Sequence, residues 1–576
     1  MHYYIAAIIL ISTLAKGGFD STTGLFLGLL ICGGLLFSHA VIPPFRLTLI
    51  FSLVCLIYLL SVIVNQFAVE NLIVATKPLV CLLFLVLIYS LKDRLYPGSL
   101  LLISALITAA IGLISFIGLI EFDGMVTAGR LQSTFQYANA AGIVFAAAAL
   151  LTDSKDFKQY RPYALILELA LILSQSVGAI IVYLFCRCFC LYFEDKNKRT
   201  ARAGAFSLRF IISALIAAAL YVLVYILKLP LAAIPVLVLV GLLPGKLDQL
   251  TAKLGSSLKI NILAASGFVF VNLMFFSLRG PGFYHTFVER LIQISDALGV
   301  VISKPLLGLG PGLWQHTRFA WQSADYQATY IHSSLLQVAV DTGLPGLAAT
   351  ALLGIYCLRK FKRHQVYLYA AMLAIFLHSL FDLTMNFLGV VFFLPILYRL
   401  YSEEEGRPVK QVKPLYLVPA TVFAYLLVVQ ALFNLAVIEL GSGDYGRSIR
   451  SLERIEPYHY NSYEIKYMLA ELYFIEGKEE KLTGQLQKLP YQTAESHFLK
   501  GYAEKRRGDS KAALEFVFKG IEQSLHQAEG YRLAGEIIAN MTPDKSAPYL
   551  SRLGEYQKQA RREKHPLAYI IEKEVD

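Results

Sequence analysis

The amino-acid sequence predicts an all-α fold, a polytopic transmembrane helical bundle of about 12–15 spans with a large extracytoplasmic loop and a C-terminal helical-repeat domain. Hydrophobic residues make up 56% of the chain and charged residues 16%, whereas soluble proteins carry about a quarter charged residues. Apolar runs alternate with short polar breaks as far as residue 437, and the rest has a soluble composition. We therefore expect transmembrane helices over 1–278 and 334–437, an outer loop over 279–333, and a helical tail over 438–576.

The apolar runs fall into two length classes. Those in the first class can each cross about 30 Å of hydrocarbon as a helix; they are 47–64, 72–91, 99–120, 208–227, 260–278, 335–358 and 414–437. The shorter runs, which need neighbours to span, are 3–15, 23–39, 139–151, 163–173, 178–193, 231–243, 366–381 and 386–398.

The basic residues predict the orientation. With the N-terminus inside, most Lys and Arg residues of the membrane region fall in inside loops, Arg209 among them, and the short outside loops hold Lys16, Arg130 and Lys228. Because positive charge resists translocation, the outer loop and the tail are predicted to be extracytoplasmic. The net charge of +11 is then mostly a topology signal, and we expect membrane lipids rather than nucleic acid as partners. All seven cysteines lie in apolar runs, and we expect neither metal nor cofactor.

The outer loop is rich in Gly, Pro, aromatic and charged residues, and residues 286–302 have helical apolar spacing. Long loops of such composition are usually functional. The tail shows a different pattern, in which a small residue stands seven positions before a turn glycine: Ala436 and Gly443, Ala470 and Gly477, Gly501 and Gly508. The tail resembles tetratricopeptide repeats, which stack helical hairpins through small residues. The alternative is a helical tail without repeat geometry.

Four groups in and after the outer loop carry candidate chemistry. They are Arg290 with Asp296, residues 304–312 (Lys-Pro-Leu-Leu-Gly-Leu-Gly-Pro-Gly), His332 with Ser333, and residues 341–346 (Asp-Thr-Gly-Leu-Pro-Gly). Each has a simpler explanation. The glycines form a tight turn or bring N–H groups to an anion. His332 serves chemistry or caps the next helix, and Arg290 binds a ligand or pairs with Asp296.

Taken together, these groups resemble the O-antigen ligase and O-antigen polymerase superfamily over residues 287–356. Upstream, residues 129–139 (Gly-Arg-Leu-Gln-Ser-Thr-Phe-Gln-Tyr-Ala-Asn) are similar to the family's Gly-Arg-x-x-Gly-Thr-Phe-x-x-Pro-Asn stretch, with Ser133 and Ala138 replacing Gly and Pro. Two further departures stand out. Val177 occupies the place of an arginine in the family's Thr-x-Ser-Arg-Gly stretch, and Ser333 stands where the family often has Asn.

The resemblance implies glycan transfer from a polyprenyl-pyrophosphate donor to a glycan, lipid or protein hydroxyl at the outer face of the bacterial cytoplasmic membrane. The reaction would be metal-independent and inverting, of the ligase or polymerase type. Guanidinium groups stabilise the charge that develops on a pyrophosphate leaving group, and neutral imidazole accepts a hydroxyl proton. The implied donor-binding residues are Arg290, Arg130, Lys304, Gly308, Gly310 and Gly312, and the implied proton acceptor is His332.

A second polar cluster follows the span at 366–381. His378 and Asp382 stand one helical turn apart if the helix continues through them. With Asn139, Ser333 and Asp341 they are candidates to line an outer cavity, or His378 and Asp382 form a polar helix contact.

Two other classes of function compete with transfer. A polysaccharide transporter or lipid-linked glycan flippase would also have many spans, but typically shows repeated halves. A non-catalytic scaffold would use the tail to bind a cell-envelope protein, and Val177 keeps this reading open. An enzyme needs His332 and Arg290 on one outside cavity, and the other two classes do not.

Overall fold

The computed structural model describes residues 1–38, 41–242, 245, 249, 282–408 and 413–572, and these are almost entirely helical. The chain is an all-α polytopic membrane protein. It forms two compact units. The bundle unit comprises Met1–Ser52, Lys77–Gly280 and Ala351–Phe423, and the loop unit comprises Leu53–Thr76, Pro281–Thr350 and Ala424–Asp576.

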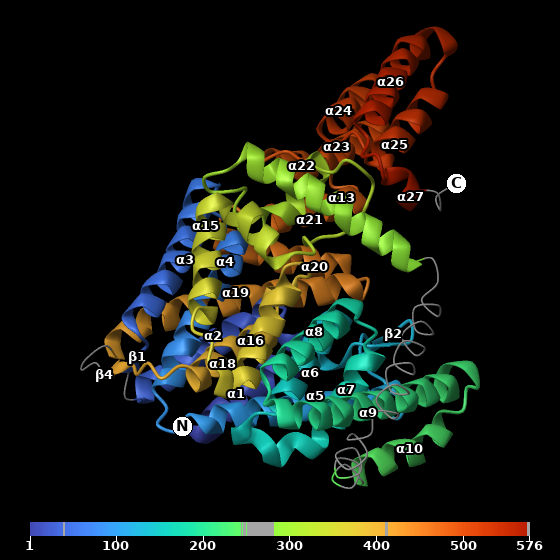
Figure 1. The fold of residues 1–576 in the computed structure, drawn as a ribbon. Coiled ribbons are helices and arrows are strands. Elements are labelled where there is room, and N and C mark those ends of the chain that lie inside the picture. Colours follow the sequence, from blue (N-terminus) through green and yellow to red (C-terminus); the bar gives the residue numbers. More distant parts are fainter. Residues whose placement is uncertain (39–40, 243–244, 246–248, 250–281, 409–412, 573–576) are drawn as a thin grey trace. The chain divides into compact units, whose positions relative to one another are not determined.

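Six described helices are long and apolar enough to cross a membrane. They are α3 (Phe45–Val64), α4 (Val69–Tyr89), α5 (Leu95–Phe116), α9 (Lys196–Tyr221) with its π-helical extension (Val222–Ile226), α15 (Ser334–Leu358) and α19 (Leu417–Gly441) (Figure 1). The shorter helices of the membrane region are α1 (His2–Leu14), α2 (Ser21–Phe37), α6 (Ala138–Leu151), α7 (Ala164–Leu173), α8 (Val177–Phe193), α10 (Pro230–Leu242), α16 (Val366–Ser379), α17 (Leu388–Val391) and α18 (Phe393–Tyr401). The predicted span 260–278 lies outside the described residues.

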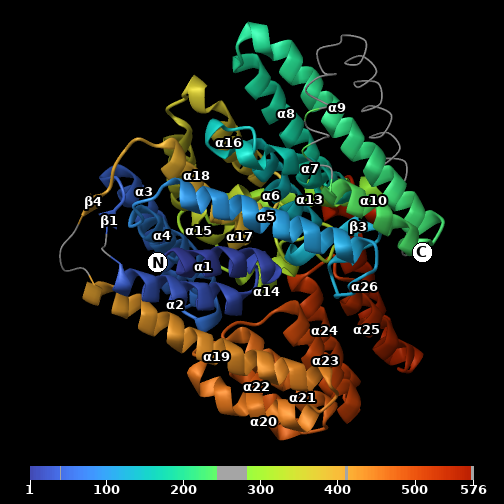
Figure 2. The same cartoon turned by 90° about the horizontal axis from the view of Figure 1, so that it is seen from below.

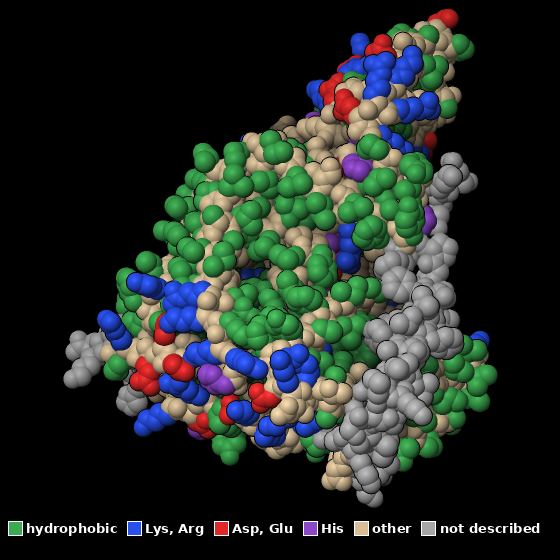
Figure 3. Space-filling view, viewed as in Figure 1, with side chains coloured by type: hydrophobic (Ala, Val, Ile, Leu, Met, Phe, Trp, Pro, Cys, Tyr) green, Lys and Arg blue, Asp and Glu red, His purple; other side chains and the backbone are tan. Residues whose placement is uncertain are grey.

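The exposed side chains distinguish helices that face lipid from helices that face water. Helix α3 exposes large apolar side chains over most of its length; they include Leu49, Leu53, Leu56, Leu60 and Ile63. The tail helices α23 to α26 instead expose many charged side chains (Figure 3). Exposed apolar side chains on a helix of spanning length fit a hydrocarbon environment, whereas a charged surface fits water.

Helix α6 is the buried centre of the bundle unit. Thirteen of its residues, from Ala138 to Leu151, are buried, and it packs against α5, α7, α8 and α16 (Figure 2). Its many alanines and Gly142 let neighbouring helices approach closely, which is how membrane helices gain packing contacts. A methyl group on Gly142 would lie 2.9 Å from the Ser174 hydroxyl.

Several of the described charged loops of the bundle unit are joined by ion pairs. The pairs join Arg94 to Glu405 (2.9 Å), Lys362 to Glu403 (2.9 Å) and Arg363 to Asp195 (3.7 Å). Helix α8 ends beside this group, and α16 begins there. The opposite ends of α6, α8 and α16 carry Asn139, Ser176 and Ser379. These ion pairs connect the loops around Arg94 and Glu405, Lys362 and Glu403, and Arg363 and Asp195, and the predicted orientation of the basic loops stays a prediction.

The sequence-based assignment of Arg209 to an inside loop is wrong. Arg209 lies inside α9, and its side chain is buried against Glu168 of α7, with Nε–Oε distances of 3.1 and 3.0 Å. The Tyr183 hydroxyl donates to the same carboxylate at 2.6 Å, and Arg187 pairs with Asp153 beside it. Apolar spacing starts the span at 208 because it does not reveal that a buried carboxylate compensates the guanidinium.

The tail is a series of helical hairpins, α20 (Tyr445–Ile455), α21 (Tyr463–Ile475), α22 (Glu479–Gln487), α23 (Ala494–Arg507), α24 (Ser510–Gln523), α25 (Ala528–Ala539), α26 (Pro543–Glu563) and α27 (Ala568–Glu572). The three turn glycines Gly443, Gly477 and Gly508 all have positive φ, which favours glycine. A methyl group on Gly501 would lie 2.6 Å from Val517, so the small residue permits close helix contact. Assignment to the tetratricopeptide class stays a prediction.

The tail packs onto the outer loop within the loop unit. Glu70, in the first turn of α4, accepts hydrogen bonds from Ser462 and from the Tyr463 N–H (3.0 Å). The His316 ring lies 5.4 Å from that of Tyr463. At the other end of the tail, the His565 N–H donates to the Ser323 carbonyl at 2.9 Å. These contacts require the outer loop and the tail to lie on the same side of the membrane.

We predict that this shared side is extracytoplasmic. Single cysteines in place of exposed Thr329 in the outer loop and exposed Glu480 in the tail should react with an impermeant maleimide on intact cells. A cysteine in place of Lys158, in a basic loop, should react only after permeabilisation, because positive loops stay inside. Wild-type labelling gives the background of the native cysteines. Protection of both outer positions would reverse the orientation, and a split between them would contradict the packing of the tail on the loop.

Candidate functional site

The outer loop is built on one long helix, α13 (Gly282–Ser303), which confirms the helix predicted over 286–302. Its buried side includes Val288, Ile292, Ala297 and Val300. The last two pack with Trp314, which is fully buried, and with Ile331 just before α15. The aromatic and aliphatic residues of the loop therefore form a core that fixes the chain immediately before His332.

His332 is held by Gln293 of α13. The Gln293 Oε1 atom accepts from the His332 N–H at 2.9 Å and lies 3.0 Å from the imidazole Nδ1. The Gln293 amide also donates to the Tyr330 carbonyl at 2.7 Å. A second glutamine, Gln337 of α15, accepts from the Ile331 N–H at 3.0 Å and donates to Asp341 at 2.9 Å. Two buried amides thus fix three consecutive backbone positions ahead of α15.

His332 does not cap α15, so that alternative is wrong. The Ser333 hydroxyl accepts from the Leu336 N–H at 3.3 Å, which is the bond of an N-terminal capping residue. Ser333, which stands where the related family often has Asn, therefore caps α15. The imidazole of His332 contacts Gln293, and its role in the chemistry stays a prediction.

Arg290 does not pair with Asp296. The Asp296 carboxylate accepts from the Ser323 hydroxyl (2.6 Å), the Ser323 N–H (3.1 Å) and the Tyr326 hydroxyl (2.9 Å). Burial raises its pKa, while these bonds lower it. Arg290 is half-buried and stands one turn before Gln293, and residues three apart share a helix face. By helical spacing, Arg290 and the residue that holds His332 therefore share one face of α13.

The glycine motif packs the outer loop against the membrane helices. The N–H groups of Gly308 and Gly310 donate to the carbonyls of Lys304 (3.1 Å) and Asp341 (3.1 Å). A methyl group on Gly308 would lie 2.2 Å from the Val340 carbonyl, and one on Gly343 would lie 2.5 Å from the Pro305 carbonyl. Both glycines have positive φ. The observed role of these glycines is close backbone packing, and donor binding by them stays a prediction.

Asp341 and Lys304 lie toward the same junction. The Ser61 hydroxyl of α3 lies 2.8 Å from the Asp341 carbonyl and 2.7 Å from the Leu307 carbonyl. Lys304 is exposed just beyond the end of α13. At 1.5 Å per residue, about 20 Å of helix separates it from Arg290. Arg290, and not Lys304, is therefore the cation within one helical turn of Gln293, which contacts His332.

A second polar cluster lies in the bundle unit, and we call it the Arg130 cluster. It comprises Arg130, Tyr137, Asn139, Ser174 and Asp382. The Arg130 guanidinium donates to the Ser174 carbonyl (3.2 Å) and to the Asn139 side-chain oxygen (3.2 Å). Asn139 in turn donates to Asp382 at 2.7 Å, and the Tyr137 hydroxyl donates to the same oxygen at 3.1 Å. The amide of Asn139 therefore links Arg130 to a buried carboxylate.

The local structure explains why these residues meet. Arg130 lies on β3 (Arg130–Leu131), which pairs with β2 (Val126–Thr127), and Asn139 lies in the first turn of α6. The described strands otherwise form one short pair, β1 (Val41–Ile42) with β4 (Arg407–Pro408). Val177 begins α8, three residues after Ser174, and Ser176 caps that helix. The position that carries arginine in the related family is thus adjacent to the loop that Arg130 contacts.

The expectation that His378 and Asp382 share a helical face is wrong. Helix α16 ends at Ser379, so Asp382 lies in the following loop and not one turn further along the helix. The His378 Nδ1 atom lies 2.6 Å from the Thr384 hydroxyl, while Asp382 turns to Asn139. Asp382 therefore bonds to a residue of another helix, a contact that sequence spacing alone does not encode.

Sequence reasoning missed two residues that shape these clusters and one lysine elsewhere in the bundle unit. Gln293 and Tyr137 were not singled out, since a lone amide or phenol in a motif carries no recognisable signal. Lys77 falls in an apolar run, yet its ammonium donates to the carbonyls of Phe19 (3.1 Å) and Asn386 (3.3 Å). An intramembrane lysine is a signal that could have identified this one.

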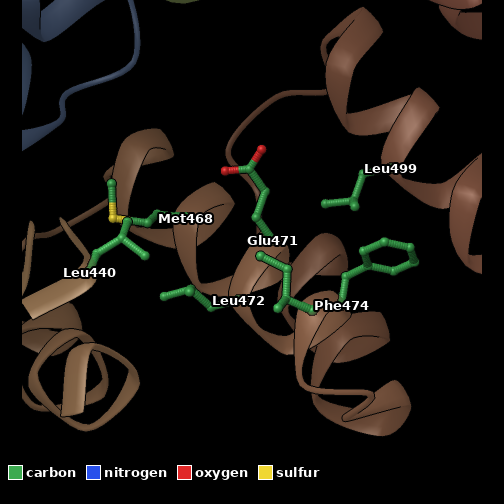
Figure 4. A pocket seen from close by; sticks show the side chains of 7 residues that line it. Leu440, Met468, Glu471, Leu472, Phe474 and Leu499 are labelled. Carbon is green, nitrogen blue, oxygen red and sulfur yellow. The ribbon is translucent and has the colours of Figure 1, made fainter. Parts of the chain in front are cut away.

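The tail has a groove of its own, lined by Leu440, Met468, Glu471, Leu472, Phe474, Ile475 and Leu499 (Figure 4). Glu471 extends among the apolar side chains, and burial followed by the nearby Glu529 and Glu495 carboxylates raises its pKa. None of the residues predicted for the site lines it.

Comparison with known proteins agrees with the sequence resemblance. No curated protein matches the chain. Residues 162–351 match the O-antigen ligase family. The matched residues include α7, Val177, Arg290, Gln293 and His332, whereas Arg130 and the tail lie outside them. The match supports the O-antigen ligase superfamily as the relationship of this part of the chain, and with it a membrane-bound glycosyl-transfer enzyme of the ligase or polymerase type.

Proposed function

We propose that the protein transfers a glycan from a polyprenyl-pyrophosphate donor to a hydroxyl acceptor at the outer face of the bacterial cytoplasmic membrane. The observation that carries this proposal is the arrangement on α13. Arg290 lies on the same face as Gln293, and Gln293 holds His332. A cation and an imidazole on one rigid support are the two groups that such a displacement needs, and both lie in the matched region.

In this proposal His332 accepts the proton of the acceptor hydroxyl as that oxygen attacks the anomeric carbon. General bases of this kind contribute about 10²–10⁴-fold to a rate. The bond from the anomeric carbon to the pyrophosphate oxygen breaks, and the electron pair leaves with the lipid pyrophosphate. Arg290 stabilises that developing charge, because a planar guanidinium donates two parallel hydrogen bonds to phosphate oxygens. Attack opposite the leaving group inverts the anomeric centre.

Arg130 is proposed as a second donor-binding cation. Asn139 accepts from its guanidinium and donates to Asp382, and these bonds keep the charged group ordered. Its position beside Ser174 offers a substitute for the arginine that Val177 replaces. Contributions of Lys304, Gly308, Gly310 and Gly312 to donor binding, and binding of an envelope protein by the tail, are retained as expectations.

Surface-glycan analysis of a deletion strain tests this function. Shortened glycan chains are expected if the enzyme polymerises repeat units, and full-length chains left on the lipid carrier are expected if it ligates them. Complementation with the wild-type gene should restore the glycan, and complementation with His332→Gln should not. Unchanged surface glycan together with no build-up of lipid-linked chains would reject glycan transfer.

A further inference from the structure

The amide of Gln293 has one orientation that its partners impose. Its Nε2 donates to the Tyr330 carbonyl and its Oε1 accepts from the His332 backbone N–H. A carbonyl oxygen can only accept and a backbone N–H can only donate, so the nitrogen and oxygen of the amide cannot be exchanged. Gln293 is fully buried, which removes water as an alternative partner.

This orientation determines where His332 carries its proton. The imidazole Nδ1 lies 3.0 Å from the same Oε1 atom, and an amide oxygen has no proton to donate. Nδ1 must therefore be the donor. In a neutral imidazole one nitrogen is protonated and the other holds the lone pair, so the lone pair is at Nε2.

We propose that Gln293 is a positioning residue that fixes the His332 tautomer and directs the basic Nε2 atom toward the acceptor hydroxyl. The tautomer follows from the geometry alone, and the identity of the acceptor rests on the proposed function. Gln293 orients the base and touches no reacting atom. Without Gln293, the imidazole can rotate or carry its proton at Nε2. After either change, the Nε2 lone pair is no longer available to the acceptor hydroxyl.

The elements on either side of His332 carry several charged or titratable groups. Helix α13 contributes Arg290 and Asp296, the approach to α15 contributes Tyr330, and α15 contributes Asp341. Burial raises the pKa of Tyr330, and Asp341 and Glu464 of the tail add to the rise. The contact of Gln293 with the imidazole is neutral, so replacing it with a carboxylate changes the charge at Nδ1 while the other groups stay the same.

Two variants of Gln293 separate orientation from charge. Gln293→Met has similar volume and no hydrogen bonds, and kcat should fall about 10- to 100-fold with little change in the donor KM, because misplacement of a reacting group costs this much. Gln293→Glu puts a carboxylate beside the imidazole, which favours the protonated form. The acidic limb of its pH–rate profile should therefore move upward by about one unit.

Gln322→Met is the matched control. Gln322 is a buried glutamine of the same outer loop and donates to the Tyr326 carbonyl at 2.9 Å. Its loss removes a comparable backbone bond and should leave the pH–rate profile in place. Equal effects of Gln322→Met and Gln293→Met on kcat and on the profile would overturn the positioning role.

A direct readout does not depend on activity. In purified full-length protein labelled with ¹⁵N-histidine, the signal that disappears in His332→Gln reports the His332 tautomer. Wild type should show Nδ1 protonated, and Gln293→Met should show a mixture or the Nε2–H form. An Nε2–H tautomer in wild type would refute the inference. The expected tautomers in protein that transfers no glycan would sustain the role of Gln293 and reject the proposed function.

Discussion

His332→Gln should lower the rate of glycan transfer by about 10²–10⁴-fold while the protein stays folded. A glutamine side chain can accept a hydrogen bond from a hydroxyl but cannot take its proton. Ser333, not His332, caps α15, so the substitution does not remove the helix cap. The measurement is single-turnover transfer from a lipid-linked donor with purified full-length enzyme, corrected for membrane abundance.

The pH dependence has a definite sign. A general base works in its neutral form, so wild-type activity should rise with pH through the range where histidines ordinarily titrate, around pH 6.5. This limb should be absent in His332→Gln. His316→Gln is the control, because His316 belongs to the same loop and packs on Tyr463 of the tail. Near-normal transfer by His332→Gln would exclude the base.

Arg290→Lys should lower kcat about 10²- to 10³-fold, the range seen when one donor to a developing oxyanion is lost. Lysine keeps the charge but replaces the planar fork with a single ammonium, so the paired contact with phosphate oxygens is lost. Arg290→Ala should be no more active than Arg290→Lys and should also weaken donor binding. The assay is transfer rate and donor affinity measured on the same preparations.

Arg318→Lys is the matched control for this change. Arg318 is also a half-buried arginine of the outer loop, and its guanidinium lies over the Phe319 ring at 4.2 Å. It has no proposed contact with the donor, and its conversion to lysine should leave transfer close to wild type. Wild-type turnover and donor affinity in Arg290→Ala would remove Arg290 from the mechanism.

Much of the fold follows from composition and periodicity. Hydrocarbon requires every backbone polar group to be satisfied within the chain, so long apolar runs can only be helices. The runs at 47–64 and 139–151 correspond closely to α3 and α6, and the amphipathic stretch at 286–302 lies within α13. The turn glycines of the tail also follow from the sequence, because a positive φ is tolerated best by glycine.

Hydrogen bonds and ion pairs between residues far apart in the sequence could not be predicted from composition and periodicity. Spacing suggested a helical face for His378 and Asp382, but the helix stops at Ser379 and Asp382 bonds to Asn139, far away in the sequence. The same limitation applies to Arg209, whose partner Glu168 is on another helix. Hydrogen bonds and ion pairs between distant segments depend on how helices pack, and a single sequence does not encode that packing in its local pattern.

By itself, then, the sequence determined that this chain is a helical membrane protein with a folded outer loop, and it singled out Arg290, Arg130 and His332 by residue type and motif. Only the tertiary structure decided what surrounds them. Gln293 lies 39 positions before His332, yet its amide fixes the imidazole because α13 passes beside the approach to α15. The residue types determine which chemical groups are present. The direction of a lone pair or a guanidinium is set by buried neighbours whose hydrogen bonds form only when the helices pack.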